Sequence, residues 1–141
     1  MLLFVQKEEA VKNVAKGTFE VTVLPLPADS TDTGGFSRLS LDKRFSGDLI
    51  GTSKGQMVAG STAVEGSAAY VALERVTGTL QGRAGSFILQ HNGTMRAGAY
   101  DLRISVVPDS GTDELVGLAG SFKIIIEGSN HFYEFEYTVG G

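Results

Sequence analysis

Apolar and polar residues alternate along most of the chain after its first sixteen residues. The clearest run is Thr18-Phe19-Glu20-Val21-Thr22-Val23, in which every second residue is apolar. Side chains of a β-strand point alternately to its two faces, so this spacing predicts a strand with one buried face. The same spacing recurs in further segments separated by short turns. The predicted strands span residues 18–23, 36–45, 49–58, 68–80, 86–95, 100–106, 122–126 and 131–139.

Glycine-rich turns separate these strands. A six-residue motif occurs twice, as Gly82-Arg83-Ala84-Gly85-Ser86-Phe87 and as Gly117-Leu118-Ala119-Gly120-Ser121-Phe122. Each copy predicts a tight corner followed by a strand whose Phe faces the core. Asn92-Gly93 is the one pair that could instead form a hairpin turn inside a predicted strand.

No interior segment has helical spacing, so no helix covers the predicted strands. Such a chain must close on itself or stack as two sheets. The neighbour-to-neighbour order of the strands predicts an all-β fold, an eight-stranded antiparallel up-and-down β-barrel. A barrel of this size has an interior that side chains fill or that holds one small ligand.

The first 14 residues do not follow the strand pattern. Lys7-Glu8-Glu9-Ala10 favours helix over strand. We therefore predict an N-terminal arm over residues 1–14, either loosely attached or packed on a neighbouring subunit, and a single barrel domain over residues 15–141.

Composition limits the classes of partner. The formal net charge is −4, which argues against nucleic acid, and no apolar run approaches the ~20 residues of a membrane helix. The absence of Cys excludes disulfides and thiolate zinc sites, and it fits the cytoplasm. The two histidines, His91 and His131, share no metal-binding motif, and no phosphate-binding loop is present, so we expect neither a metal nor another cofactor.

Ionisable residues fall on faces that are otherwise apolar. Glu74 and His91 lie on neighbouring predicted strands, where a carboxylate could orient an imidazole as a general base. Two structural alternatives stay open. Glu74 could form an ion pair with Lys43 or Arg75, and His91 could bond only to the backbone.

The remaining inward-facing residues form the predicted ligand wall. A Tyr hydroxyl, from Tyr70 or Tyr133, could donate a hydrogen bond to a ligand carbonyl or enolate. Tyr100 and Tyr133 are also typical of amphipathic residues at a barrel rim. The predicted ligand-contacting residues are Lys43, Tyr70, Phe87, Leu89, Tyr100, Phe122, Tyr133 and Phe135.

Gly51-Thr52-Ser53-Lys54-Gly55 matches the Gly-x-Ser-x-Gly pattern of a hydrolase nucleophile. That motif needs a turn from a strand into a helix, which presents the Ser. The residues that follow here have no helical character. We therefore interpret these glycines as allowing strand curvature.

Three stretches resemble a bacterial family of uncharacterised proteins of this size. They run over residues 78–94, 47–51 and 110–120, and the resemblance as a whole covers roughly residues 16–139. It implies an eight-stranded barrel similar to the allene oxide cyclase fold. Those cyclases, and the dirigent proteins similar to them, guide ring closure or coupling of reactive intermediates without a cofactor. Their catalytic residues have no matching motif in this chain.

Three functions fit these observations. The first is a barrel that binds a small apolar or carbonyl-containing ligand in its lumen. The second is a cofactor-independent isomerase or cyclase that uses Glu74 and His91. The third is a structural barrel with a filled lumen. Apolar residues on the predicted outer face indicate a homo-oligomer, and these are Val71, Leu73, Ile88 and Ile125.

Overall fold

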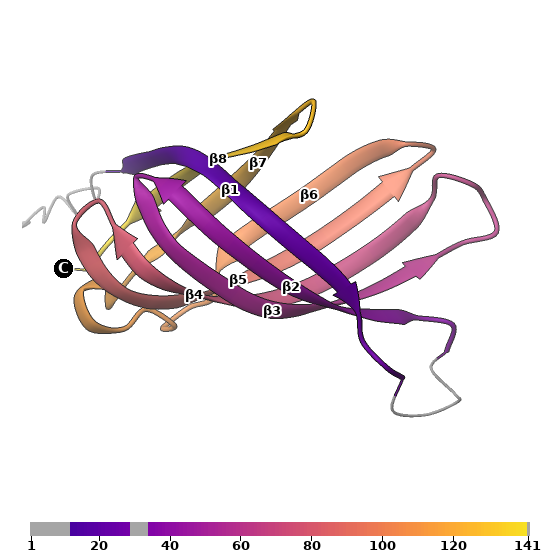
Figure 1. Ribbon diagram of the computed structural model, residues 1–141, viewed down its shortest axis with the longest axis horizontal. Helices are drawn as coiled ribbons and strands as arrows, with labels where there is room; N and C mark the ends of the chain where they lie inside the picture. The colour runs from indigo at the N-terminus through magenta and orange to yellow at the C-terminus, as the bar shows by residue number, and fades with distance from the viewer. Residues whose placement is uncertain (1–11, 29–33, 141) are drawn as a thin grey trace, which may run out of the picture.

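The computed structural model describes residues 12–28 and 34–140. In these residues, eight antiparallel strands follow one another around a closed barrel, and the last strand pairs with the first (Figure 1). This confirms the predicted all-β, up-and-down architecture. The strands are β1 (Asn13–Pro25), β2 (Ser37–Gly47), β3 (Leu49–Ser61), β4 (Ala68–Leu80), β5 (Arg83–Arg96), β6 (Ala99–Val106), β7 (Ala119–Glu127) and β8 (Asn130–Thr138). A short 3-10 helix, η1 (Asp113–Leu115), lies between β6 and β7.

Several strands are longer than the segments that alternation predicts, because backbone pairing continues past the ends of those segments. β1 begins at Asn13, because Asn13 and Val14 pair with Tyr137 and Glu136 of β8. The sequence predicts these two residues in the N-terminal arm, whereas the structure places them in the barrel. Of the rest of the predicted arm, Lys12 is exposed and precedes β1, and residues 1–11 lie outside the described residues. Asn92-Gly93 makes no turn, since β5 runs through it without a break.

The turn between β4 and β5 contains only Gln81 and Gly82. Both have positive φ, 44° and 86°, as a two-residue hairpin turn of the primed type requires. Gly adopts this conformation without steric cost, whereas Gln81 is held by tertiary contacts. Its backbone N–H donates to the Asp48 carbonyl at 2.8 Å, and its side-chain oxygen accepts a hydrogen bond from the Tyr137 hydroxyl.

Packed aromatic rings fill the end of the barrel that contains the β2–β3 and β4–β5 turns. Phe122 stacks on Tyr133 at 5.3 Å between ring centroids, and Phe135 lies 5.4 Å from Phe122. The Tyr133 hydroxyl donates to the Ser46 carbonyl at 2.8 Å and accepts from the Leu49 backbone N–H at 2.9 Å. Its polar atom is therefore satisfied inside the core, and packed side chains occupy this half of the barrel.

One pair of neighbouring strands has far fewer paired residues than the others. β6 and β7 share a single residue pair, Ser105 with Ser121, while the other neighbouring strands pair along most of their length. From that pair the two strands diverge toward the opposite end of the barrel (Figure 1). We call this junction the β6–β7 seam.

The outer face carries some of the apolar residues expected there. Val71 and Leu73 of β4 are more than half exposed, whereas Ile88 and Ile125 are half-buried. Val58 of β3 lies directly opposite Val71. The homo-oligomer stays a prediction. Within residues 12–28 and 34–140, no helix is long and apolar enough to cross a membrane.

Candidate functional site

Four polar side chains meet inside the barrel, one from each of β2, β3, β4 and β5. Glu74 is central: its Oε1 accepts hydrogen bonds from Lys43 Nζ at 2.9 Å and from His91 Nε2 at 2.6 Å. Its Oε2 accepts one from Ser53 Oγ at 2.6 Å. All four side chains are buried. A buried charge is tolerated only when it is paired and hydrogen-bonded, and both oxygens of Glu74 meet this condition.

Strand register brings these residues together. Lys43 of β2 lies directly opposite Ser53 of β3. Glu74 lies opposite Gly55, and a Cβ at that glycine would come within 2.7 Å of the Glu74 Cβ. Because Gly55 has no side chain, β3 can approach β4 closely at the carboxylate. His91 lies opposite Ala72, one step along the inward face from Glu74.

The environment of Glu74 favours its charged form. Burial by itself raises the pKa of this carboxyl, but the hydrogen bond from His91 and the charge of Lys43 act in the other direction. The hydrogen bond from Ser53 adds to that lowering. Together they bring the pKa of Glu74 to about 2, from an ordinary value of 4.5. Glu74 is therefore ionised throughout the physiological range.

The structure combines two alternatives that the sequence left open. Glu74 both forms the ion pair with Lys43 and contacts His91. Arg75 has no part in this cluster, since its side chain is on the exposed face of β4. In the described part of the chain, no group of three or more acidic, His or Cys side chains is placed to hold a metal ion.

A large cavity opens above this cluster, in the half of the barrel that the aromatic rings do not fill. Its volume is about 1430 Å³. Lys43, His91 and Tyr70 contribute polar groups to its lining, whereas Glu74 and Ser53 lie beneath them and do not reach it. Glu74 thus contacts His91 and Lys43 rather than the cavity, the arrangement expected of a carboxylate that orients an imidazole. The surrounding wall is largely apolar and includes Val21, Leu41, Met57, Ile104 and Ile124.

Two polar atoms at the cavity floor are left for a ligand. Because His91 uses Nε2 to bond Glu74, its Nδ1 is the atom that a ligand can meet, and no described residue bonds to Nδ1. The Tyr70 ring lies 6.2 Å from the His91 ring. Burial and then the charge of Glu74 raise the pKa of Tyr70 to about 12, so its phenol stays protonated and can donate a hydrogen bond.

The predicted ligand wall divides into three groups. Lys43 and Tyr70 line the cavity, and Phe122 lies at its boundary with the core. Tyr100 is at the mouth, where it is 81% exposed. The remaining assignments are corrected, because these side chains lie in the filled half and contact one another instead of the cavity. They are Phe87, Leu89, Tyr133 and Phe135.

Sequence reasoning missed the role of Ser53. β3 continues through it to Ser61, so it occupies no nucleophile elbow, as its sequence context predicted. Its hydroxyl instead donates to Glu74. The available signal was its place on the inward face of β3, two residues from Gly51 and from Gly55. Phe19 was also missed as a partner of the site, and Lys43 Nζ lies 5.1 Å from its ring centroid.

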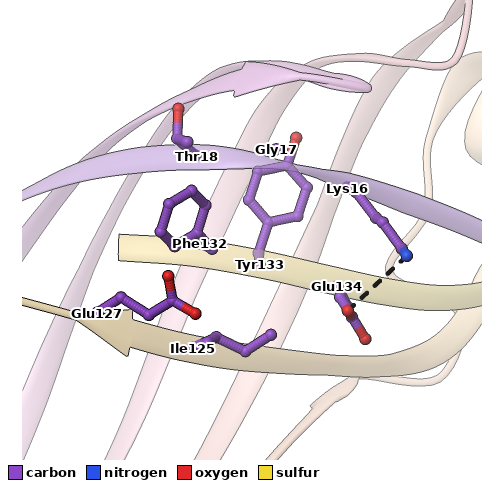
Figure 2. Close-up of a pocket in the computed structure, with 8 residues that line it drawn as sticks. All are labelled: Lys16, Gly17, Thr18, Ile125, Glu127, Phe132, Tyr133 and Glu134. Carbon is purple, nitrogen blue, oxygen red and sulfur yellow. Dashed lines mark ion pairs between the residues drawn. The ribbon is translucent and has the colours of Figure 1, made fainter. Parts of the chain in front are cut away.

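A second hollow of about 450 Å³ lies on the outer surface of β1, β7 and β8. Figure 2 shows Phe132 and Ile125 along it, with the amine of Lys16 directed toward Glu134 at 3.9 Å. Both partners of this ion pair are exposed, and such pairs contribute little energy. The one buried polar side chain in its lining is Tyr133, whose hydroxyl is already bonded to Ser46 and Leu49, so the lumenal cavity is the better candidate.

Comparison with known proteins identifies the family but no activity. The chain is similar to a solved structure from Shewanella oneidensis MR-1, described as a protein of unknown function from the DUF3224 family. The two share 47% sequence identity with a TM-score of 0.84, over 94% of this chain and 99% of that one. A search of curated proteins found no match. The likeness to allene oxide cyclases stays a prediction. The sequence model of the family described as "Protein of unknown function (DUF3224)" matches residues 15–137, and the chain therefore belongs to that family.

Proposed function

We propose that this protein binds a small, largely apolar ligand bearing a carbonyl or hydroxyl group in the open half of the barrel. The observation that carries the proposal is the cavity of about 1430 Å³, whose lining surface is mostly apolar, with Lys43, Tyr70 and His91 inside it. Further charged residues of its lining, among them Asp101, Arg103 and Lys123, belong to β6 and β7. Small-molecule sites usually have this composition, in cavities of about 300–1,000 Å³. The cavity is large enough for such a ligand.

The polar groups at the cavity floor favour a ligand with a neutral oxygen over a ligand with an anionic group. Lys43 is already neutralised by Glu74, so it offers no unpaired positive charge to a carboxylate or phosphate. Tyr70 supplies a protonated donor and His91 an acceptor at Nδ1 when its imidazole is neutral. A ligand carbonyl would accept from Tyr70, and a ligand hydroxyl would donate to His91.

Binding is tested with prodan, an uncharged naphthalene ketone whose fluorescence reports the polarity around its carbonyl. We expect saturable binding with a blue-shifted emission. Met57→Trp places a large ring on the cavity side of β3 and is expected to weaken binding by about tenfold or more, or ~1.4 kcal/mol. The matched control is Val58→Trp, which puts the same ring on the exposed face of the same strand. Fluorescence titration gives both dissociation constants.

Two results would contradict the binding proposal. One is the absence of saturable prodan binding by the folded wild-type protein. The other is an equal loss of affinity in Met57→Trp and Val58→Trp, which would place the probe outside the lumen.

A second function, cofactor-independent proton transfer, is favoured by the 2.6 Å hydrogen bond between Glu74 and His91. A carboxylate that accepts the Nε2 proton leaves Nδ1 as a base oriented toward the cavity. In this scheme Nδ1 removes a proton from the carbon next to a ligand carbonyl. The electron pair moves onto the carbonyl oxygen, and Tyr70 stabilises the enolate by a hydrogen bond. When the ligand is a β,γ-unsaturated ketone the enolate is a conjugated dienolate, and return of the proton to its γ-carbon would complete an isomerisation.

Proton transfer is measured as exchange of the α-hydrogens of 2-tetralone for deuterium in D₂O, followed by NMR. We expect exchange faster than in buffer, lowered by about 100-fold in His91→Asn because a positioned base contributes at least that much. Far-UV circular dichroism of the same variant checks that the barrel remains folded. Exchange at the same rate in wild type and His91→Asn would exclude His91 as the base and leave the binding function alone.

A further inference from the structure

The cavity has an incomplete wall at the β6–β7 seam. Beyond the single pair of Ser105 with Ser121, residues of both strands line the cavity, including Leu102 of β6 and Ile124 of β7. The seam lies next to the polar floor, because His91 of β5 pairs with Ile104 of β6. A ligand that passes between β6 and β7 would therefore reach Tyr70 and His91 directly.

Apolar residues along the seam are exposed where the two strands separate. Tyr100 is 81% exposed, Ile126 63% and Leu102 38%. All three line the cavity, so their exposure results from the separation of the strands. Exposed apolar side chains gathered at one opening are typical of a surface that another molecule covers.

The register of the seam shows what closing it would bring together. If the antiparallel ladder continued from Ser105 and Ser121, Leu102 would lie opposite Ile124, and Tyr100 opposite Ile126. Pairs of aromatic and β-branched residues stabilise antiparallel strands. On the outer side Arg103 would face Lys123, and two positive charges opposite each other oppose pairing. The seam thus has inner contacts that favour closure and an outer charge pair that opposes it.

We propose that the β6–β7 seam is the portal through which the ligand enters, and that the ladder between β6 and β7 lengthens over the bound ligand. This inference rests on the proposed binding function. It also narrows the ligand class: the polar end lies at Tyr70 and His91, and an apolar body extends under Leu102 and Ile124. Contact with that body supplies the free energy that moves the seam from its open to its closed arrangement.

The test uses engineered disulfides, because the protein has no Cys of its own. Arg103→Cys/Lys123→Cys can cross-link only when the ladder extends by two residues beyond its present pair. The matched control, Ser105→Cys/Ser121→Cys, joins residues that are already paired. Prodan is expected to accelerate cross-linking of the first variant by about fivefold and to leave the control unchanged. Each variant is compared with itself, with and without prodan, since the cysteines remove the charge repulsion.

The cross-linked proteins then report the route of entry. Stopped-flow fluorescence should show prodan association and release slowed by about tenfold or more in the 103–123 disulfide, and restored by reducing agent. The 105–121 disulfide should leave both rates as they are. Unchanged rates in the cross-linked 103–123 protein would show that the ligand enters elsewhere. If the 103–123 pair fails to cross-link both with and without prodan, while the control pair does cross-link, then the proposed closure of the seam is wrong. Absence of prodan binding by the wild type would instead refute the proposed function itself.

Discussion

Replacement of Glu74 by leucine is expected to lower the free energy of unfolding by about 3–5 kcal/mol, although leucine suits a barrel interior. The reason is the charge left behind. Lys43 is buried and its amine is paired with Glu74, so Glu74→Leu leaves an ammonium group in the core without a counterion. Urea denaturation followed by circular dichroism measures the loss.

The double variant Lys43→Met/Glu74→Leu separates the cost of the unpaired charge from the cost of altered packing. With both charges removed, we expect most of the lost stability to return, since apolar residues of similar volume often replace a buried ion pair without loss. Ser53→Ala serves as the mild comparison, because it removes one hydrogen bond to Glu74 and should cost about 1–2 kcal/mol. A loss below about 1 kcal/mol in Glu74→Leu would mean that Lys43 finds water in the cavity, and the ion pair would then be unimportant for stability.

Acid is expected to destabilise the wild-type protein by about 3 kcal/mol through Glu74 alone. The pKa of this carboxyl is about 2 in the folded protein and 4.5 in its ordinary state. A carboxyl with a lowered folded pKa contributes stability that is fully present above the unfolded value, here pH 4.5. That contribution is lost as the pH falls from 4.5 toward 2, because protonation then costs the folded state its contacts with Lys43 and His91.

The difference between wild type and Glu74→Gln isolates this effect from other acidic groups. Glutamine does not titrate, so the stability gap between the two proteins should be widest above pH 5 and should narrow as the pH approaches 2. Glu136→Gln is the control, because that carboxylate is exposed and only weakly paired, with Lys12 at 4.0 Å. Urea unfolding at half-unit pH steps gives the profiles. Parallel profiles for wild type and Glu74→Gln down to pH 2.5 would contradict the lowered pKa.

The two predictions bear on function because Glu74 does not reach the cavity. Its expected contribution is to hold the Nε2 side of His91 and the amine of Lys43, leaving Nδ1 directed at a ligand. A site whose polar groups are fixed in advance loses less entropy on binding. We therefore expect Glu74 variants to lose both folding stability and the fixed orientation of His91 and Lys43.

Local patterns were sufficient to predict the strands, their inward faces and most turns. Alternation is a property of neighbouring residues, so it is visible without the fold, and it placed Glu74, His91 and Lys43 on inward faces. The repeated glycine motif likewise marked the starts of β5 and β7, with Phe87 and Phe122 buried after each. The charge, the absence of Cys and the motif resemblance limited the classes of function and pointed to a family without an assigned activity.

Tertiary structure alone decided which inward residues fill the barrel and which border the cavity. Phe135 and Lys43 both face inward, yet one is in the packed half and the other at the cavity floor, because their levels along the barrel depend on the register of all eight strands. Register also placed Ser53 against Glu74, a contact between residues 21 positions apart. The β6–β7 seam could not be predicted from the sequence either. Both strands alternate normally, and alternation does not indicate how many residues of two neighbouring strands pair. What the sequence determined was each strand and its buried face, which are local properties. The cavity, the Glu74 cluster and the open seam arise from contacts between distant strands, which only the closed barrel brings together.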